Sequence, residues 1–142
     1  MNVITPTFEK RITPDLIEKL EPQEVFVFGS NESGTHGSGA ARTALRWGAI
    51  MGIGIGKYGQ TYAIPTKDFN IKTLPIPQIQ TYVDQFISDA KWMNHTFLVT
   101  EIGCGLADYT PEDIAPLFKK AMEVENIFLP KRFWDILLKD TN

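Results

Sequence analysis

The stretch of the chain that says most about its fold runs from Val25 to Leu45 and reads VFVFGSNESGTHGSGAARTAL. Its first four residues are apolar and rich in β-formers. The run is too short for a helix, so it predicts a strand that is buried on both faces. A glycine-rich loop follows. A helix is expected from about Ser38 to Trp47, because small and apolar residues recur there at helical spacing.

Outward from this stretch, further strands and helices alternate along the chain. Short apolar runs predict strands at 61–64, 96–100 and 126–129, and helical spacing of apolar residues predicts helices at 79–90, 110–122 and 133–138. Thr110-Pro111-Glu112-Asp113 is typical of a helix start, and Thr13-Pro14-Asp15 predicts a short helix that ends before Pro22. We therefore expect an α/β fold with a largely parallel central sheet, as a single domain over residues 1–142.

Length and composition exclude several classes of protein. A chain of 142 residues with 43% hydrophobic and 22% charged residues is the size of one domain and can form a core. One cysteine excludes an intrachain disulfide, and a net charge of −3 argues against a general nucleic-acid coat or a membrane-surface binder. No apolar run reaches the roughly 18 residues of a membrane helix, and the N-terminus lacks the apolar core of a signal peptide. We expect a soluble cytoplasmic protein.

The eleven glycines fall into three patches, at 29–39, 48–59 and 103–105. Glycine is needed where the backbone takes positive φ or where something approaches the main chain closely. All three patches follow or border predicted strands, as does the turn at Pro65-Thr66-Lys67. We expect these loops to meet at one end of the sheet, where ligands bind in parallel α/β folds.

The first glycine patch predicts a phosphate site, because exposed N–H groups and the dipole of the following helix attract anions. A flexible surface loop is the alternative. The letters of Gly54–Gly59, GIGKYG, match a dinucleotide-binding fingerprint, but they precede a strand instead of opening a helix. Met51 and Tyr58 occupy positions where a P-loop has glycine and Ser or Thr. Both motifs are therefore rejected.

Few side chains offer metal or nucleophilic chemistry. His36, His95 and Cys104 lack metal-ligand spacing, so neither a metal nor another cofactor is expected. We interpret Cys104 as a small buried thiol rather than a nucleophile, and His36 as a solvated loop residue rather than a phosphate or ribose contact.

Lys67 and Asp108 fall at the same predicted sheet end. There a lysine could bind phosphate or form an imine and an aspartate could act as acid or base; an exposed lysine and a helix-flanking aspartate are the alternatives.

Several of these segments resemble the macro domain. FVFGSN at 26–31, followed by GSGAA at 37–41, is similar to that family's strand, its small-residue turn ending in asparagine, and the glycine stretch that opens a helix. YAIPTK at 62–67 resembles its central strand, and IGCGL at 102–106 with Asp108 resembles its second phosphate loop. The branch most similar to the chain contains the terminal ADP-ribose protein glycohydrolase and the antitoxins that remove ADP-ribose from DNA. Small uncharacterised bacterial and phage proteins also carry these strings.

The resemblance covers about residues 24–129 and implies a three-layer α/β/α sandwich that binds ADP-ribose or a related nucleotide. Lys67 matches the lysine that attacks the anomeric carbon or stabilises charge. Asp108 matches the catalytic aspartate, displaced by one position by Ala107. Asp15 and Glu24 are the candidates for the adenine-binding aspartate. The implied ligand-binding residues are Gly29, Ser30, Asn31, Gly37, Ser38 and Gly39 in the first loop, and Ile102, Gly103, Cys104, Gly105 and Leu106 in the second.

Three functions follow as alternatives. The first is hydrolysis of ADP-ribosyl linkages on protein or nucleic acid, for which such loops could stabilise an oxocarbenium-like ribose beside a bound diphosphate. The second is a non-catalytic reader or sensor of ADP-ribose or an NAD metabolite. The third is an interaction protein that retains only the fold.

Overall fold

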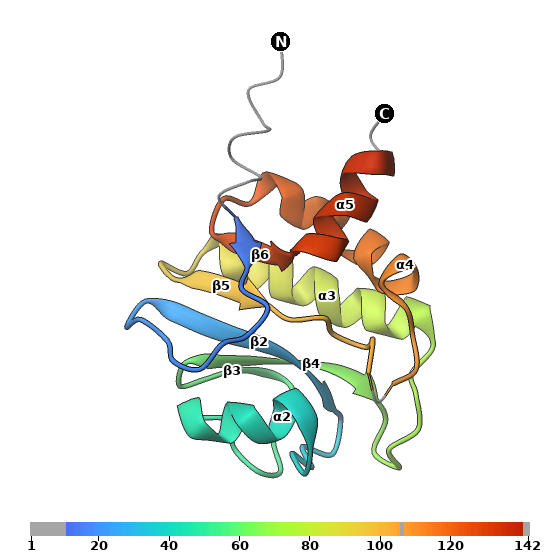
Figure 1. The fold of residues 1–142 in the computed structure, drawn as a ribbon. Helices are drawn as coiled ribbons and strands as arrows, with labels where there is room; N and C mark the ends of the chain where they lie inside the picture. The colour runs from blue at the N-terminus through green and yellow to red at the C-terminus, as the bar shows by residue number, and fades with distance from the viewer. Residues whose placement is uncertain (1–10, 106, 141–142) are drawn as a thin grey trace.

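The computed structural model describes residues 11–105 and 107–140, and it has the expected α/β fold with a mostly parallel sheet. The sheet has six strands in the order β1-β6-β5-β2-β4-β3 (Figure 1). All neighbouring strands are parallel except β3 and β4. The strands are β1 Ile12–Thr13, β2 Glu24–Asn31, β3 Gly56–Tyr58, β4 Thr61–Lys67, β5 Thr96–Val99 and β6 Ile127–Pro130.

The helices connect these strands and cover the sheet. They are α2 Gly39–Ala44 with the 3₁₀ turn η1 Leu45–Trp47, α3 Ile76–Lys91, α4 Pro111–Ile114 with the 3₁₀ helix η2 Ala115–Glu123, and α5 Lys131–Asp140. Figure 1 shows α2 on one side of the sheet and α3, α4 and α5 on the other. None of the helices in the described part of the chain is both long enough and apolar enough to span a membrane.

Strand β2 is buried on both faces, as its continuous apolar run predicts. Val25 and Val27 belong to one core cluster, and Phe26 and Phe28 belong to another. Because side chains alternate between the faces of a strand, these two clusters lie on opposite faces of the sheet. The central position of β2, between β4 and β5, follows from this double burial.

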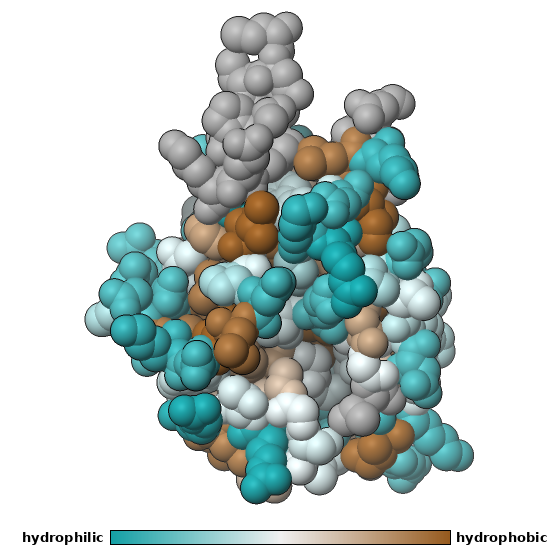
Figure 2. Space-filling model, in the orientation of Figure 1, coloured by the Kyte–Doolittle hydropathy of each residue, from teal (hydrophilic) through white to brown (hydrophobic). Residues whose placement is uncertain are grey.

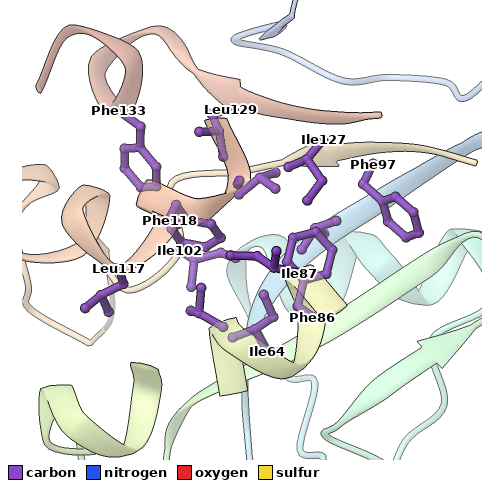
Figure 3. Packing of buried hydrophobic residues seen from close by; sticks show 14 of the residues in the cluster. Ile64, Phe86, Ile87, Phe97, Ile102, Leu117, Phe118, Ile127, Leu129 and Phe133 are labelled. Carbon is purple, nitrogen blue, oxygen red and sulfur yellow. The ribbon is translucent and has the colours of Figure 1, made fainter. Parts of the chain in front are cut away.

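The larger cluster lies between the sheet and the helices α3, η2 and α5 (Figure 3). Phe86 of α3 makes edge-to-face contacts with Tyr62 of β4, Phe97 of β5 and Phe118 of η2. The stripe predicted for α3 is buried at Ile79, Val83, Phe86, Ile87 and Ala90. This packing holds β4 and β5 beside β2, so that their carboxyl ends lie together.

The helix expected at 13–20 is wrong. Ile12 and Thr13 instead pair with Leu129 and Pro130 as β1, and residues 14–20 contain no helix. A helix this short gains little from its own hydrogen bonds. Here the segment packs Ile17 and Leu20 against the smaller core cluster, while Leu16 is 74% exposed. Tertiary contacts therefore decide the path of this segment.

Candidate functional site

A cleft of about 350 Å³ lies at the carboxyl ends of β2, β4 and β5, where the parallel sheet predicts a ligand site. In Figure 2 the surface between α2 and the end of β4 is pale, near the middle of the hydropathy scale. The sequence-predicted residues that line the cleft are Gly29, Ser30, Asn31, Gly37, Ser38, Gly39, Lys67, Ile102, Gly103 and Gly105. The first and third glycine patches thus meet at one cavity, together with the lysine that follows β4.

Three predicted residues are not placed in this lining. Leu106 lies outside the described residues. Cys104 packs against the larger core cluster, and burial, with Glu101 nearby, raises the pKa of its thiol to about 11. That environment suits the small, unreactive thiol expected from the sequence. Asp108 is exposed and takes a left-handed φ of 66°, while its neighbour Ala107 lines the cleft.

At Gly37 and Gly105 neither packing nor backbone conformation explains the absence of a side chain. Neither has a positive φ, and a Cβ built on either would meet no protein atom within 4 Å. Both line the cleft. The lack of a side chain at these positions therefore keeps space open inside the cleft, and it leaves main-chain atoms of both loops accessible to a bound group.

The second glycine patch does not join the cleft, contrary to expectation. A Cβ on Gly54 would lie 1.8 Å from the carbonyl oxygen of Asn31, and one on Gly34 would lie 2.2 Å from the nitrogen of Ile53. Here two backbones cross in direct contact. Further along this patch, β3 pairs antiparallel with β4. Gly52 and Gly54 therefore contact the first loop, and no glycine of the second patch is among the residues that line the cleft.

Side chains of the first loop are used to hold its own shape. The Asn31 carbonyl oxygen Oδ1 accepts hydrogen bonds from Thr35 N at 2.8 Å and Ser33 Oγ at 2.8 Å, and its Nδ2 donates to the Thr35 carbonyl. His36 is 1% exposed, and its Nε2 is shared between the carbonyls of Ile50 and Ile53 at 3.1 and 3.0 Å. His36 is thus neither a solvated loop residue nor a ligand contact, because it is buried and its Nε2 is engaged by the two carbonyls of the crossing segment.

Lys67 enters the cleft from the end of β4. Its main chain pairs with Thr73 across a short hairpin, and the Thr73 hydroxyl donates to the Ala107 carbonyl at 3.3 Å. Ile71, in this hairpin, lines the cleft with a φ of 62°, which is strained for a β-branched residue. The hairpin and Ala107 therefore form one connected wall beside Lys67.

The charged residues that line the cleft lie at the ends of β4 and β5, the two strands that flank β2. Among the described lining residues, Lys67 and Glu101 are the charged ones. Across residues 11–105 and 107–140, no group of three or more His, Cys, Asp or Glu side chains could hold a metal ion. The arrangement offers one cation and many main-chain groups, which suits an anionic organic ligand better than a metal-bound one.

A second cavity of about 650 Å³ adjoins the cleft, and the sequence did not predict it. Thr100 and Glu101 line both cavities. The second cavity is built from distant segments. Its lining comprises Thr13 at the end of β1 and Pro14, Asp15, Leu16 and Ile17 after it, Phe26, Thr43, and Pro130, Lys131 and Arg132 at the junction of β6 and α5. Of the two adenine-binding candidates, Asp15 lines this cavity. Glu24 does not line it.

Comparison with family models, with curated proteins and with solved structures found no match to the chain.

Proposed function

We propose that this protein binds ADP-ribose or a related nucleotide diphosphate in the cleft, on a three-layer α/β/α sandwich of the macro-domain kind. The observation that carries the proposal is the pair Gly37 and Gly105, which face the cleft and whose missing side chains leave main-chain atoms exposed. A diphosphate lying between the two loops would be contacted by N–H groups from both sides.

The two adjoining cavities support an orientation for this ligand. The distal ribose would lie towards Asn31 and Lys67, which are partners in the register of β2 and β4. The adenosine would pass Thr100 and enter the second cavity, where the Asp15 carboxylate could accept a hydrogen bond from the adenine amino group. The combined space suits an elongated nucleotide better than a single small anion.

Binding is tested by calorimetry with ADP-ribose on the wild-type protein and on Gly37→Val and Gly105→Val. A valine at either position fills open space, so we expect affinity to fall at least about tenfold while the melting temperature stays close to that of the wild type. Unchanged affinity in both variants would show that the diphosphate does not lie between these loops.

Lys67 favours ADP-ribosyl hydrolysis as a second candidate function, because it lines the cleft at the proposed ribose end. It could attack the anomeric carbon or stabilise charge there, with Asp108 as the acid or base. We expect the wild type to release ADP-ribose from modified protein or DNA, Lys67→Ala with Asp108→Ala to abolish release, and Lys57→Ala, which removes a lysine outside the cleft, to retain it. Binding without release selects a reader. No binding of any nucleotide overturns both functions and favours an interaction protein.

A further inference from the structure

Glu101 lies where the cleft and the second cavity meet. It comes shortly after β5, and with Thr100 it lines both spaces. Its side chain is 33% exposed, so it is part of the wall and is still accessible to a ligand. A molecule that occupies both cavities would pass Thr100 and Glu101.

The carboxylate of Glu101 is held in place by Arg132, from the first turn of α5. Arg132 Nε donates to Oε2 of Glu101 at 2.6 Å, and Nη2 donates to Oε1. This two-pronged pairing fixes the plane of the carboxylate and uses one acceptor position on each oxygen. The remaining acceptor positions are available to hydroxyl groups of a ligand.

The cations beside the second cavity already have acidic partners. Lys131 Nζ lies 3.1 Å from Asp135 Oδ2, and Arg132 is engaged by Glu101. Asp15 adds another carboxylate to the same lining. The three carboxylates, Asp15, Glu101 and Asp135, outnumber the two cations, Lys131 and Arg132, so this part of the site suits an uncharged sugar and base better than an additional phosphate.

We propose that Glu101, positioned by Arg132, determines specificity for the sugar of the bound nucleotide. Its carboxylate accepts hydrogen bonds from the hydroxyls of the adenosine-side ribose, as acidic residues do in dinucleotide-binding folds. A 2′-phosphate at the same place meets a like charge and no unpaired cation. The site therefore takes ADP-ribose and excludes its 2′-phosphorylated form. This inference rests on the proposed binding of ADP-ribose.

The test measures the dissociation constants of ADP-ribose and of ADP-ribose 2′-phosphate, by calorimetry, for the wild type, Glu101→Gln and Glu123→Gln. Glu123 is exposed and lines neither cavity, so its variant removes the same charge elsewhere. We expect the wild type and Glu123→Gln to prefer ADP-ribose at least about tenfold, and Glu101→Gln to reduce that preference to about threefold or less. An analogue that is 2′-deoxy at the adenosine ribose should bind the wild type several-fold more weakly than ADP-ribose does. Glu101→Gln should bind the analogue and ADP-ribose with about equal affinity.

The outcomes separate this inference from the proposed function. If the wild type binds neither nucleotide, both are overturned. If it binds ADP-ribose but discriminates no better than Glu101→Gln, or prefers the 2′-phosphate, only the role of Glu101 is overturned. The expected change in preference, confined to Glu101→Gln, supports it.

Discussion

Among single residues, Arg11 is a buried charged residue whose guanidinium is bound by several main-chain carbonyls. Its side chain is 4% exposed, and its guanidinium donates to the carbonyls of Ala121, Met122, Val124 and Ile127. The guanidinium carbon also lies 5.1 Å from the centre of the Trp134 ring. Burial lowers the pKa of Arg11, but several acceptors and an aromatic face compensate for the lost water. Arg11 thereby fastens the end of η2 to β6 and α5.

Replacing Arg11 tests that role. Arg11→Met keeps much of the apolar stem but leaves the carbonyls of the η2 end without their donor, so we expect the free energy of unfolding to fall by about 2–4 kcal/mol. Arg11→Lys should recover little of the loss, because an ammonium cannot reproduce the planar fork. Urea unfolding followed by circular dichroism measures both variants. A loss below about 0.5 kcal/mol for Arg11→Met would contradict the structural role.

At the scale of elements, the crossing of the first loop with residues 50–54 is what shapes the cleft. The Ser30 hydroxyl donates to the Gly54 carbonyl, and Gly52 N donates to the Gly34 carbonyl at 2.9 Å. His36 adds the contacts of its Nε2 with the carbonyls of Ile50 and Ile53. The loop that lines the cleft is therefore held by hydrogen bonds to a second loop.

This crossing predicts that two alanine substitutions differ strongly in their effect on stability. Gly54→Ala places a methyl group against the Asn31 carbonyl, so the free energy of unfolding should fall by about 2 kcal/mol or more. Gly37→Ala points into open space and should change it by no more than about 0.5 kcal/mol. Thermal unfolding of both variants checks the contrast. Equal stability of the two would mean that the backbones do not cross as closely as described.

At the scale of the whole molecule, one buried and two partly buried groups keep their protons more tightly in the folded state. Burial raises the pKa of Tyr62 above its usual range, and a hydrogen bond to Asp89 adds to the effect. Burial and a hydrogen bond to Glu32 raise the pKa of Tyr82 to about 12, and the pKa of Cys104 is raised to about 11. The unfolded chain loses these protons at lower pH than the folded protein does.

Stability should therefore decline in alkaline solution. The contribution of these groups is complete below their unfolded pKa values, near 9 for the thiol and 10 for the tyrosines, and it is lost as pH rises towards the folded values. Urea unfolding from about pH 8 to about pH 11 measures the decline. Tyr62→Phe, which cannot ionise, should show a shallower decline than the wild type. An equal slope in both proteins would remove Tyr62 from the explanation.

The pattern of the sequence predicts well those features that neighbouring residues decide. The strands β2, β4, β5 and β6 follow from short apolar runs, and α3 follows from its helical stripe. The start at Thr110 is confirmed by a capping box with Asp113. The two glycine loops and Lys67 could be assigned to one end of the sheet, because carboxyl ends of parallel strands lie together.

The amino-acid sequence by itself determined the α/β class, the doubly buried strand β2 and the end of the sheet at which two glycine loops and Lys67 meet, since hydrophobic periodicity and backbone freedom are local properties. Only the tertiary structure decided that residues 14–20 form no helix, that the second glycine patch supports a loop crossing, and that Glu101 meets Arg132 beside a second cavity. These features depend on contacts between segments that are distant along the chain, and their strength is set by packing and desolvation, which no short window of sequence records.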